Sequence, residues 1–413
     1  MSPLLGCLAD DYTGGTDVAA ALRRSGLRTL LLFGAPTPET TVPDCDAIVV
    51  CLKTRTAPAD EAVRQSLAVH RWLLAQGVSH PYVKYCSTFD STDQGNIGPV
   101  VDAVTQADDR PLTIVCPAAP EHGRTLYQGH LFVGDRLLSQ SPMRHHPLTP
   151  MTDSDLVAVL GRQTPYPVAL LAHEVVAQGG DAVRTALRDL RERGIRHVVT
   201  DAVDDHDLDT IAAAAGPLAL MTGAAGLARA VGALLAQTAG EGAGGGETVP
   251  PLPGGPGIVI AGSCSAATLE QVARAREKFP SYRLHPQAGD LIGDCLRWLE
   301  AHLGDGSVMV YSSAPPEERA ETPPDTADVL EQALAAAARH AVERGARRVV
   351  VAGGETSGAV VNALGVTSVI VSAEADRGVP WCVTTASPPL ALLLKSGNFG
   401  HPDLLVRAME QRQ

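Results

Sequence analysis

Short apolar runs alternate with helical segments along most of the chain, and this alternation limits the possible folds more than any other feature. An apolar run at 4–9 ends at a polar turn, a helical pattern follows at 16–25, and Gly26 separates it from a second apolar run at 27–33. A strand, a helix and a second strand in this order are typical of a βαβ unit with parallel strands. The sequence therefore predicts an α/β fold with mainly parallel sheets flanked by helices.

A Gly- and Pro-rich segment interrupts this pattern past the middle of the chain. Residues 240–256 contain Gly-Ala-Gly-Gly-Gly and Pro-Pro-Leu-Pro-Gly-Gly-Pro, which is the composition of a linker. A second series of strands and helices begins directly after it. We therefore predict two domains, 1–239 and 257–413, joined by a linker at 240–256.

The composition favours some classes of partner over others. The 413 residues carry a formal net charge of −13 and only 4% are aromatic, which argues against a nucleic-acid-binding surface. A small anionic substrate is still compatible, because it needs only a few local cations. None of the eight cysteines forms a CxxC pair, the first residues do not have the pattern expected of a leader, and no apolar run approaches bilayer length. We expect a cytoplasmic protein with reduced thiols and no membrane partner.

The first candidate site follows the first predicted strand. Asp10 and Asp11 stand before a predicted turn at 12–15. Carboxylates can accept hydrogen bonds from hydroxyl groups, and one of them could act as a general base toward an alcohol. An aspartate here could instead cap a helix. Capping explains two consecutive aspartates less well, so we favour a catalytic role for Asp10 and Asp11.

A second polar cluster follows the predicted strand at 82–85. Lysine, hydroxyl and carboxylate groups in such a loop could hold a polyhydroxy carboxylate, with lysine on the acid group and Asp90 on the alcohols. A solvated polar loop explains these residues about as well. The predicted substrate-binding residues are Arg55, Lys84, Ser87, Thr88 and Asp90.

Three small-residue loops follow predicted strands in the second half of the chain, at 262–265, 353–358 and 395–400. Glycines allow the backbone to approach a phosphate, and the N–H groups at a helix start attract it. A single glycine could simply serve a tight turn, but three such loops in one domain favour a nucleotide. The predicted contacts are Ser263, Gly353, Gly354, Glu355, Thr356, Ser357, Lys395, Gly397 and Asn398.

Several familiar catalytic motifs are absent from the sequence. There is no GxxxxGK[ST] phosphate loop, no GxGxxG after the first strand, no HExxH and no GxSxG. These absences argue against P-loop enzymes, dinucleotide oxidoreductases, zinc proteases and serine hydrolases. No set of metal ligands can be identified, and we interpret His145 and His146 as loop residues.

Three of these segments resemble the four-carbon acid sugar kinases. They are Ala-Asp-Asp-Tyr-Thr-Gly-Gly-Thr-Asp at 9–17, Val-Ala-Gly-Gly-Glu-Thr-Ser-Gly at 351–358 and Lys-Ser-Gly-Asn-Phe-Gly at 395–400. Many relatives carry Phe and Ala where this chain has Tyr12 and Gly15. The resemblance to the 3-oxo-tetronate 4-kinase branch is carried by segments at 84–92, 95–100, 123–125, 129–132 and 146–151.

The resemblance implies a sugar-acid domain followed by an ATP domain. The expected reaction transfers the γ-phosphoryl group of ATP to the 4-hydroxyl of a 3-oxo-tetronate, with Mg²⁺ bridging the phosphates. Asp10 or Asp11 would be the base, and Lys395 would neutralise phosphate charge. A threonate or erythronate kinase and a non-catalytic sensor of sugar acid or nucleotide are the alternatives. The sequence leaves the oligomeric state open, with a homodimer as one arrangement.

Overall fold

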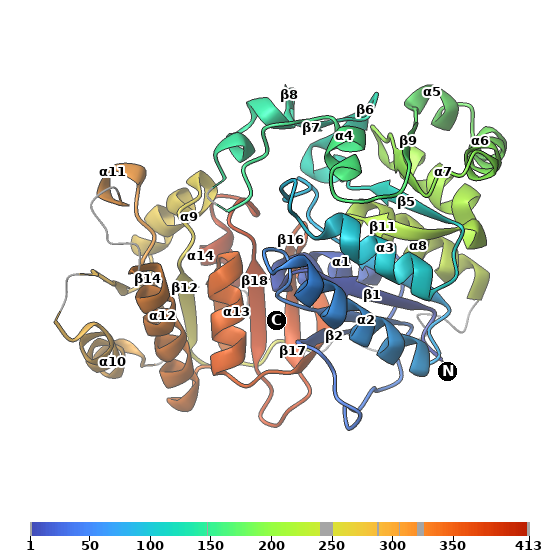
Figure 1. The fold of residues 1–413 in the computed structure, drawn as a ribbon. Helices are drawn as coiled ribbons and strands as arrows, with labels where there is room; N and C mark the ends of the chain where they lie inside the picture. The colour runs from blue at the N-terminus through green and yellow to red at the C-terminus, as the bar shows by residue number, and fades with distance from the viewer. Residues whose placement is uncertain are drawn as a thin grey trace. The chain divides into compact units, whose positions relative to one another are not determined.

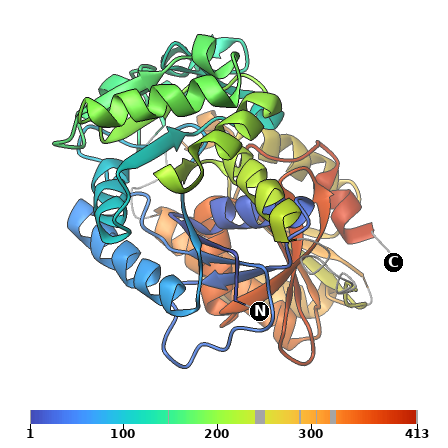
Figure 2. The same cartoon turned by 90° about the vertical axis from the view of Figure 1, so that its right-hand side faces the viewer.

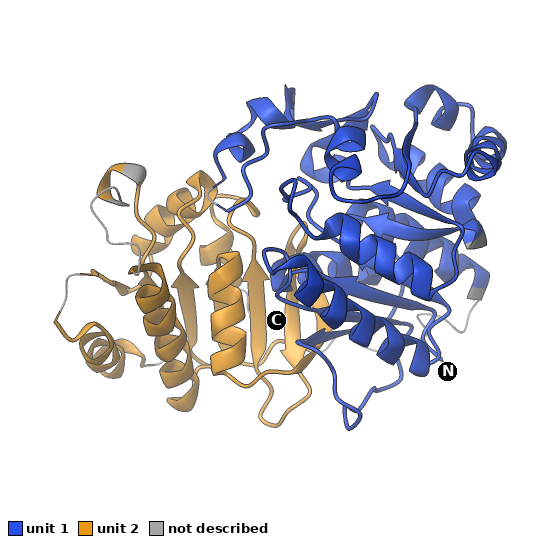
Figure 3. Cartoon of the chain, viewed as in Figure 1, with its two compact units in different colours: residues 1–246 blue, residues 247–413 orange. Residues whose placement is uncertain are grey.

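The computed structural model describes residues 2–146, 148–239, 251–286, 289–304, 306–319 and 326–410. The chain divides into two compact units, 1–246 and 247–413 (Figure 3). Each unit contains a mainly parallel sheet with helices on both faces, which confirms the predicted fold class. Of the predicted linker at 240–256, residues 240–250 lie outside the part of the chain that the structure describes.

A wholly parallel sheet forms the centre of unit 1. Its strands are β1 (Leu5–Ala9), β2 (Thr29–Phe33), β3 (Ala47–Cys51), β4 (His80–Lys84), β5 (Leu112–Cys116), β9 (Val168–Leu171), β10 (His197–Thr200) and β11 (Ala219–Gly223). They follow the order β2-β3-β1-β4-β11-β5-β10-β9. The central strands are apolar and buried along nearly their whole length, because helices cover both faces of the sheet.

Helices cover both faces of this sheet (Figures 1 and 2). One face carries α1 (Tyr12–Arg24), α6 (Gly180–Glu192), α7 (Asp205–Ala215) and α8 (Ala225–Ala239), with α5 (His173–Val176) beside α6 and α7. The other carries α2 (Ala59–Ala75), α3 (Ile97–Ala107) and α4 (Leu156–Gly161). Short 3₁₀ turns are η1 (Pro120–His122), η2 (Leu138–Gln140), η3 (Pro142–His145) and η4 (Gly216–Leu218).

Unit 1 also contains a small antiparallel sheet that was not predicted from the sequence. It consists of β6 (Arg124–Tyr127), β7 (His130–Val133) and β8 (Arg136–Leu137). Asp201, which is fully buried, anchors the turn between β6 and β7. Its carboxylate accepts hydrogen bonds from the backbone N–H groups of Gln128 at 2.7 Å and Gly129 at 2.9 Å.

Unit 2 contains a mixed sheet. Its strands are β12 (Gly257–Ala261), β13 (Ser281–Arg283), β14 (Val308–Tyr311), β15 (Arg348–Ala352), β16 (Ser368–Asp376), β17 (Val379–Thr384) and β18 (Ala391–Lys395). Within the unit they follow the order β13-β14-β12-β15-β18-β17-β16. The first five are parallel, and β17 is antiparallel to both of its neighbours. The strands β13, β14 and β17 were not predicted from the sequence.

Helices again cover both faces. One face carries α9 (Ala266–Arg276) and α14 (Leu404–Glu410), and the other carries α12 (Thr326–Glu343) and α13 (Gly354–Ala363). The short α11 (Pro316–Arg319) and α10 (Leu291–His302), which lies against α12, complete the unit. No helix in the described part of the chain is long and apolar enough to cross a bilayer.

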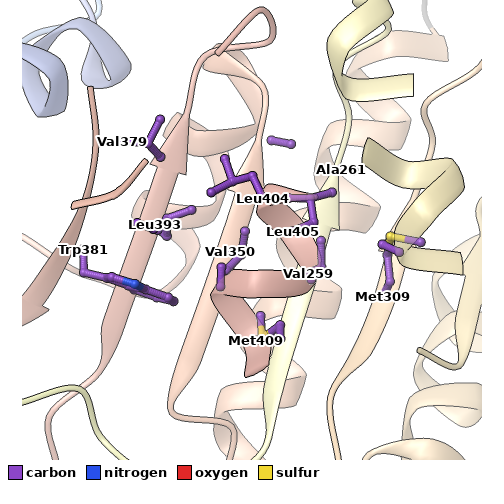
Figure 4. Close-up of a cluster of buried hydrophobic side chains, with 14 of the residues drawn as sticks. Val259, Ala261, Met309, Val350, Val379, Trp381, Leu393, Leu404, Leu405 and Met409 are labelled. Atoms are coloured by element: carbon purple, nitrogen blue, oxygen red, sulfur yellow. The ribbon is translucent and has the colours of Figure 1, made fainter. Parts of the chain in front are cut away.

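The core of unit 2 holds α9 and α14 against the sheet. Figure 4 shows Leu404, Leu405 and Met409 beside strand residues that include Val350 and Leu393. Burial of each such side chain contributes about 1.5–3 kcal/mol to stability. Helix α9 joins the same core through Val272 and Ala275, so its position relative to the strand ends is well defined.

Candidate functional site

The strands β1, β3 and β4 end at the same level of the unit 1 sheet. Ala9 lies opposite both Cys51 and Lys84 in the parallel registers. Backbone hydrogen bonds extend this alignment, because Asp10 N–H donates to the Lys84 carbonyl at 3.2 Å and Asp10 C=O accepts from Thr54 N–H at 2.9 Å. The structure therefore brings the predicted residues Asp10, Arg55 and Lys84 together at the carboxyl edge, where open α/β sheets bind ligands.

An ion-pair array forms the centre of this edge. Arg55 donates through Nε and Nη2 to the two oxygens of Asp10, at 2.9 and 2.8 Å. Its Nη2 also donates to Asp11 Oδ1 at 2.7 Å. Arg55, which we predicted to bind the substrate, is thus paired with Asp10 in this structure through a bidentate charge-assisted contact.

Asp11 also caps helix α1. Its Oδ1 accepts from Gly14 N–H at 2.8 Å, and its Oδ2 accepts from Thr13 Oγ1 at 2.9 Å. The predicted turn at 12–15 is therefore wrong, since these residues form the first turn of α1. A Cβ atom at Gly14 would lie 2.2 Å from Asp11 Oδ1 and 3.1 Å from Lys84 Nζ. The glycine allows the carboxylate and the ammonium group to approach the helix start.

The two aspartates differ in their electrostatic surroundings. Burial acts to raise the pKa of Asp11, but Arg55, Lys84 and the hydrogen bonds from Thr13 and Gly14 hold it below its ordinary value. Burial raises the pKa of Asp10 above its ordinary value, although Arg55 opposes this effect. Neighbouring carboxyl groups with pKa values moved apart are typical of acid–base sites.

Lys84 and the loop after it are largely buried. Lys84 is 3% exposed, and its Nζ donates to the Tyr85 carbonyl at 2.9 Å. Thr88 Oγ1 donates to Asp90 Oδ1 at 2.6 Å, and both residues are buried. Of the predicted loop residues only Ser87 is half-buried, so its hydroxyl is the most accessible to a ligand.

Two amide side chains that we had not predicted as site residues hold these loops in place. Asn96 Nδ2 donates to the carbonyls of Thr54 at 2.6 Å and Ala57 at 2.9 Å. Gln163 accepts from Gly98 N–H at 3.0 Å and donates to the Thr92 carbonyl at 2.7 Å. Asn96 lies in a segment that carried the family resemblance, whereas nothing in the sequence marked Gln163, which lies far along the chain.

In unit 2, the ends of β12, β15 and β18 also lie at one level. Ala352 is opposite Ala261 and Lys395. The Ala352 carbonyl accepts hydrogen bonds from Gly262 and Ser263 N–H, both at 3.1 Å, and the Lys395 carbonyl accepts from Gly353 N–H at 3.0 Å. The three predicted nucleotide loops therefore meet at the carboxyl edge of this unit.

The predicted loop at 353–358 is mostly helix. Only Gly353 lies outside α13, with φ of 136°, and α13 begins at Gly354. A Cβ atom at Gly353 would lie 3.2 Å from Ser263 N, so the glycine also permits close contact between two loops. Gly354 and Glu355 are exposed, while Ser357 is fully buried with its hydroxyl bonded to the Gly353 carbonyl at 2.6 Å. The free N–H groups of this first turn can receive an anion.

Lys395 is a buried cation at the end of β18. It is 1% exposed, and its Nζ donates to Thr268 Oγ1 at 2.9 Å and the Gly397 carbonyl at 3.1 Å. Among the described residues, no carboxylate forms an ion pair with it. Burial lowers its pKa to about 7. Asn398, two residues beyond Gly397, is exposed.

Comparison with known proteins assigns the two units. A model of a sugar-binding N-terminal domain matches residues 5–231, and a model of a nucleotide-binding C-terminal domain matches residues 258–405. The chain is thus a two-domain protein in which a sugar-binding domain precedes a nucleotide-binding domain.

The similarity to curated relatives extends over nearly the full length. The chain is 48% identical to a 3-oxo-tetronate kinase of Cupriavidus necator, over 99% of this chain and 97% of the relative. It is 46% identical to a 3-oxo-tetronate kinase of Burkholderia multivorans, over 98% of this chain and 97% of the relative. The chain therefore belongs to the family of four-carbon acid sugar kinases.

Solved structures share the fold. A Salmonella typhimurium LT2 protein, provisionally described as a tRNA synthase, is 36% identical with a TM-score of 0.88, and the match covers 99% of both chains. The Haemophilus influenzae protein HI1011 is 37% identical with a TM-score of 0.78, over 98% of both chains.

Proposed function

We propose that this protein transfers the γ-phosphoryl group of ATP to the 4-hydroxyl of a 3-oxo-tetronate, giving 3-oxo-tetronate 4-phosphate and ADP. The observation that carries the proposal is the similarity to proteins named 3-oxo-tetronate kinase, at 38–48% identity, which spans both domains and both candidate sites. The polar edge of unit 1 suits a hydroxylated acid, and the glycine-containing edge of unit 2 suits phosphates.

The acceptor site would lie at the edge formed by Asp10, Asp11, Arg55 and Lys84. Arg55 and Lys84 offset the charge of the two aspartates, so the site can receive hydroxyl groups without strong repulsion of an anionic substrate. We assign the proton acceptor to Asp10, because its pKa is raised, which makes it the stronger base, whereas the pKa of Asp11 is lowered and its carboxylate caps helix α1. Ser87, Thr88 and Asp90 would contact the rest of the acid.

The donor site would lie at the edge formed by Ser263, Gly353 and Lys395. Phosphoryl transfer depends chiefly on positioning and on neutralisation of charge. The N–H groups of Gly354 and Glu355 and the buried ammonium group of Lys395 are suited to phosphate oxygens.

Mg²⁺ is expected to accompany the nucleotide. The described residues contain no cluster of three or more side chains that could hold a metal ion by themselves. This fits Mg²⁺, which keeps several waters and binds mainly to substrate phosphates. Glu355 is the one acidic residue in the three loops and is exposed, so it could hold the ion directly or through water. The ion would neutralise charge on the transferred phosphoryl group.

We further propose that the protein acts in the cytoplasm on a small molecule and not on nucleic acid. Its eight cysteines are free, and most are buried, as expected for a reducing compartment. Its net charge of −13 disfavours a phosphate backbone as a partner.

The test is a kinase assay on the purified full-length chain. ADP release is measured with ATP, Mg²⁺ and a panel of four-carbon acids that includes 3-oxo-tetronates, threonate and erythronate. Turnover of a 3-oxo-tetronate alone is expected. Turnover of threonate or erythronate alone would contradict the substrate assignment, and ligand binding without any ADP release would identify a sensor.

A further inference from the structure

The loop between β18 and α14 turns its backbone carbonyls toward helix α9. The Gly397 carbonyl accepts from Ser265 Oγ at 2.5 Å, Thr268 Oγ1 at 2.9 Å and Lys395 Nζ at 3.1 Å. Three further carbonyls, those of Phe399, Gly400 and His401, lie 3.1, 3.0 and 3.0 Å from Gln271 Nε2. One helix therefore holds four carbonyls of one loop.

The two residues that make these contacts from within α9 are Thr268 and Gln271, and both are fully buried. They lie three positions apart, which places them on the same side of the helix. Helix α9 is capped by Ser265, whose Oγ accepts from Thr268 N–H at 3.2 Å, and its buried face joins the core of unit 2. The loop is thus attached to a rigid element, whereas the carbonyls of most surface loops face water.

The side-chain amide of Gln271 is imperfectly hydrogen-bonded in this position. Its amide nitrogen has two hydrogens but lies within hydrogen-bonding distance of three carbonyls. Its Oε1 is buried and has no hydrogen-bond partner among the described residues. An unsatisfied buried acceptor costs about 1–3 kcal/mol, so stability alone explains this glutamine poorly.

The direction of the carbonyls determines the direction of the neighbouring N–H groups. In a trans peptide the C=O and the following N–H point to opposite sides. Among the described residues, the cis peptide lies at Ser387–Pro388, away from this loop. Because the carbonyls of Gly397 and Phe399 face α9, the N–H groups of Asn398 and Gly400 face away from it.

The loop also contacts the other two nucleotide loops. A Cβ atom at Gly397 would lie 2.4 Å from Ser263 Oγ, so the chain at Gly397 passes directly beside Ser263. Gly353 N–H donates to the carbonyl of Lys395, two residues before Gly397. The outward N–H groups of Asn398 and Gly400 therefore belong to the same edge as the start of α13.

We propose that Thr268 and Gln271 are positioning residues for nucleotide binding. By holding the carbonyls of the loop against α9, they present the N–H groups of Asn398 and Gly400 as a pair of donors for phosphate oxygens. This inference rests on the proposed kinase function, for which it adds a backbone phosphate-binding element and the side chains that orient it.

Isosteric variants test the positioning role. Thr268→Val removes the hydroxyl with little change in shape, and Gln271→Met removes the amide at similar volume. Each is expected to raise the KM for ATP about 10-fold, with the kcat and the KM for the sugar acid within about twofold of the original protein. Thr268→Ser, which keeps the hydroxyl, is expected to restore the original KM.

The matched control is Thr105→Val in unit 1. Thr105 is equally buried, and its Oγ1 donates to the Val101 carbonyl at 2.6 Å within α3. The Thr105→Val variant should have a lower melting temperature than the original protein and an unchanged KM for ATP. An unchanged KM in folded Thr268→Val and Gln271→Met, or an equal rise in Thr105→Val, would overturn the positioning role.

Hydrogen exchange in the unaltered protein gives a second test that does not require a variant to fold. Saturating ADP is expected to slow exchange of the Asn398 and Gly400 amides at least about 10-fold. ADP binding without this protection would overturn the inference and leave the kinase function standing. A lack of any ADP or ATP binding would instead overturn the proposed function.

Discussion

Each unit buries a lysine at the end of a central parallel strand, but the two lysines have opposite surroundings. Lys84 ends β4 and is 3% exposed, and Lys395 ends β18 and is 1% exposed. The charge of Lys84 acts on two carboxylates, since it lowers the pKa of Asp11 and opposes the raised pKa of Asp10. Within the described ranges, Lys395 Nζ donates hydrogen bonds to the Thr268 hydroxyl and the Gly397 carbonyl, and no carboxylate pairs with it.

This difference separates two ways of preparing a binding site. A buried charge costs several kcal/mol unless an opposite charge or strong hydrogen bonds offset that cost. Unit 1 places its cations beside its own carboxylates, so the array is almost neutral before any ligand binds. In the part of unit 2 that the structure describes, no carboxylate pairs with the buried cation, so an incoming phosphate would supply the opposite charge.

The largest effect is expected from loss of a carboxylate in unit 1. Asp10→Asn should reduce kcat by about 100-fold or more, because a positioned general base typically contributes at least that factor. Asp11→Asn should also impair transfer, but less than Asp10→Asn, while ADP affinity measured by calorimetry stays unchanged in both. Full turnover in Asp10→Asn would remove Asp10 from the mechanism. Asp93→Asn, which changes an exposed ion pair with Arg162, is the control.

An intermediate effect is expected on stability, with opposite signs for the two lysines. Lys84→Met should lower the free energy of unfolding by about 2–3 kcal/mol, because it leaves buried carboxylates with one cation fewer. Lys395→Met should raise it by about 1–2 kcal/mol, because it replaces a buried unpaired charge with an apolar side chain. Both are measured by urea unfolding.

The control for this pair is Lys278→Met, since Lys278 is exposed and should change the free energy of unfolding by less than about 0.5 kcal/mol. If Lys84→Met and Lys395→Met lowered the free energy of unfolding by similar amounts, the comparison would be contradicted. Such a result would mean that both lysines are stabilised by their surroundings.

The smallest effect concerns pH. The pKa of Lys395 in the folded protein is about 7, below the ordinary lysine value of 10.5. Between these two values the unfolded chain binds one more proton than the folded chain. The contribution of this lysine to the free energy of unfolding should therefore rise with pH from about 7 to 10.5 and be constant below 7.

A bound phosphate should raise this pKa again, because an anion stabilises the charged ammonium group. ATP binding at pH 8 should therefore be accompanied by proton uptake, and ATP affinity should fall as the pH rises above 7. Calorimetry in two buffers with different ionisation enthalpies measures the uptake. Lys395→Met should abolish the contribution of this group, and equal uptake with and without the lysine would show that another group titrates.

Most of the parallel strands could be predicted, because strands buried on both faces appear in the sequence as continuous apolar runs. The starts of α1 and α13 could not be predicted correctly. Glycines at Gly14, Gly15 and Gly354 favour a loop by local propensity. At Gly15 the helix packs so closely on β3 that a Cβ atom would lie 1.9 Å from Cys51 Sγ. A glycine is therefore needed inside the helix at this position, although its local propensity favours a loop.

The candidate site was only partly predictable, for a similar reason. Asp10 and Arg55 follow strands and Lys84 ends one, and the ends of these strands align in any parallel sheet of this order, so their proximity could be anticipated. Gln163 and Gln271 could not be found in this way. Each contacts a loop that lies far away in sequence, and a single glutamine on or beside a helix carries no local signal of such a contact.

The sequence by itself therefore determined the α/β class and the family, and it indicated the polar and glycine-containing segments that end the strands at both edges. Apolar periodicity and long ordered motifs depend on residues that are close together in the chain, so they can be recognised in the sequence alone. Only the tertiary structure decided which charges are paired. Arg55 binds Asp10 and Asp11, whereas Lys395 is buried with no carboxylate partner among the residues that the structure describes. That difference depends on strand register and loop packing, which bring distant residues within a few ångströms.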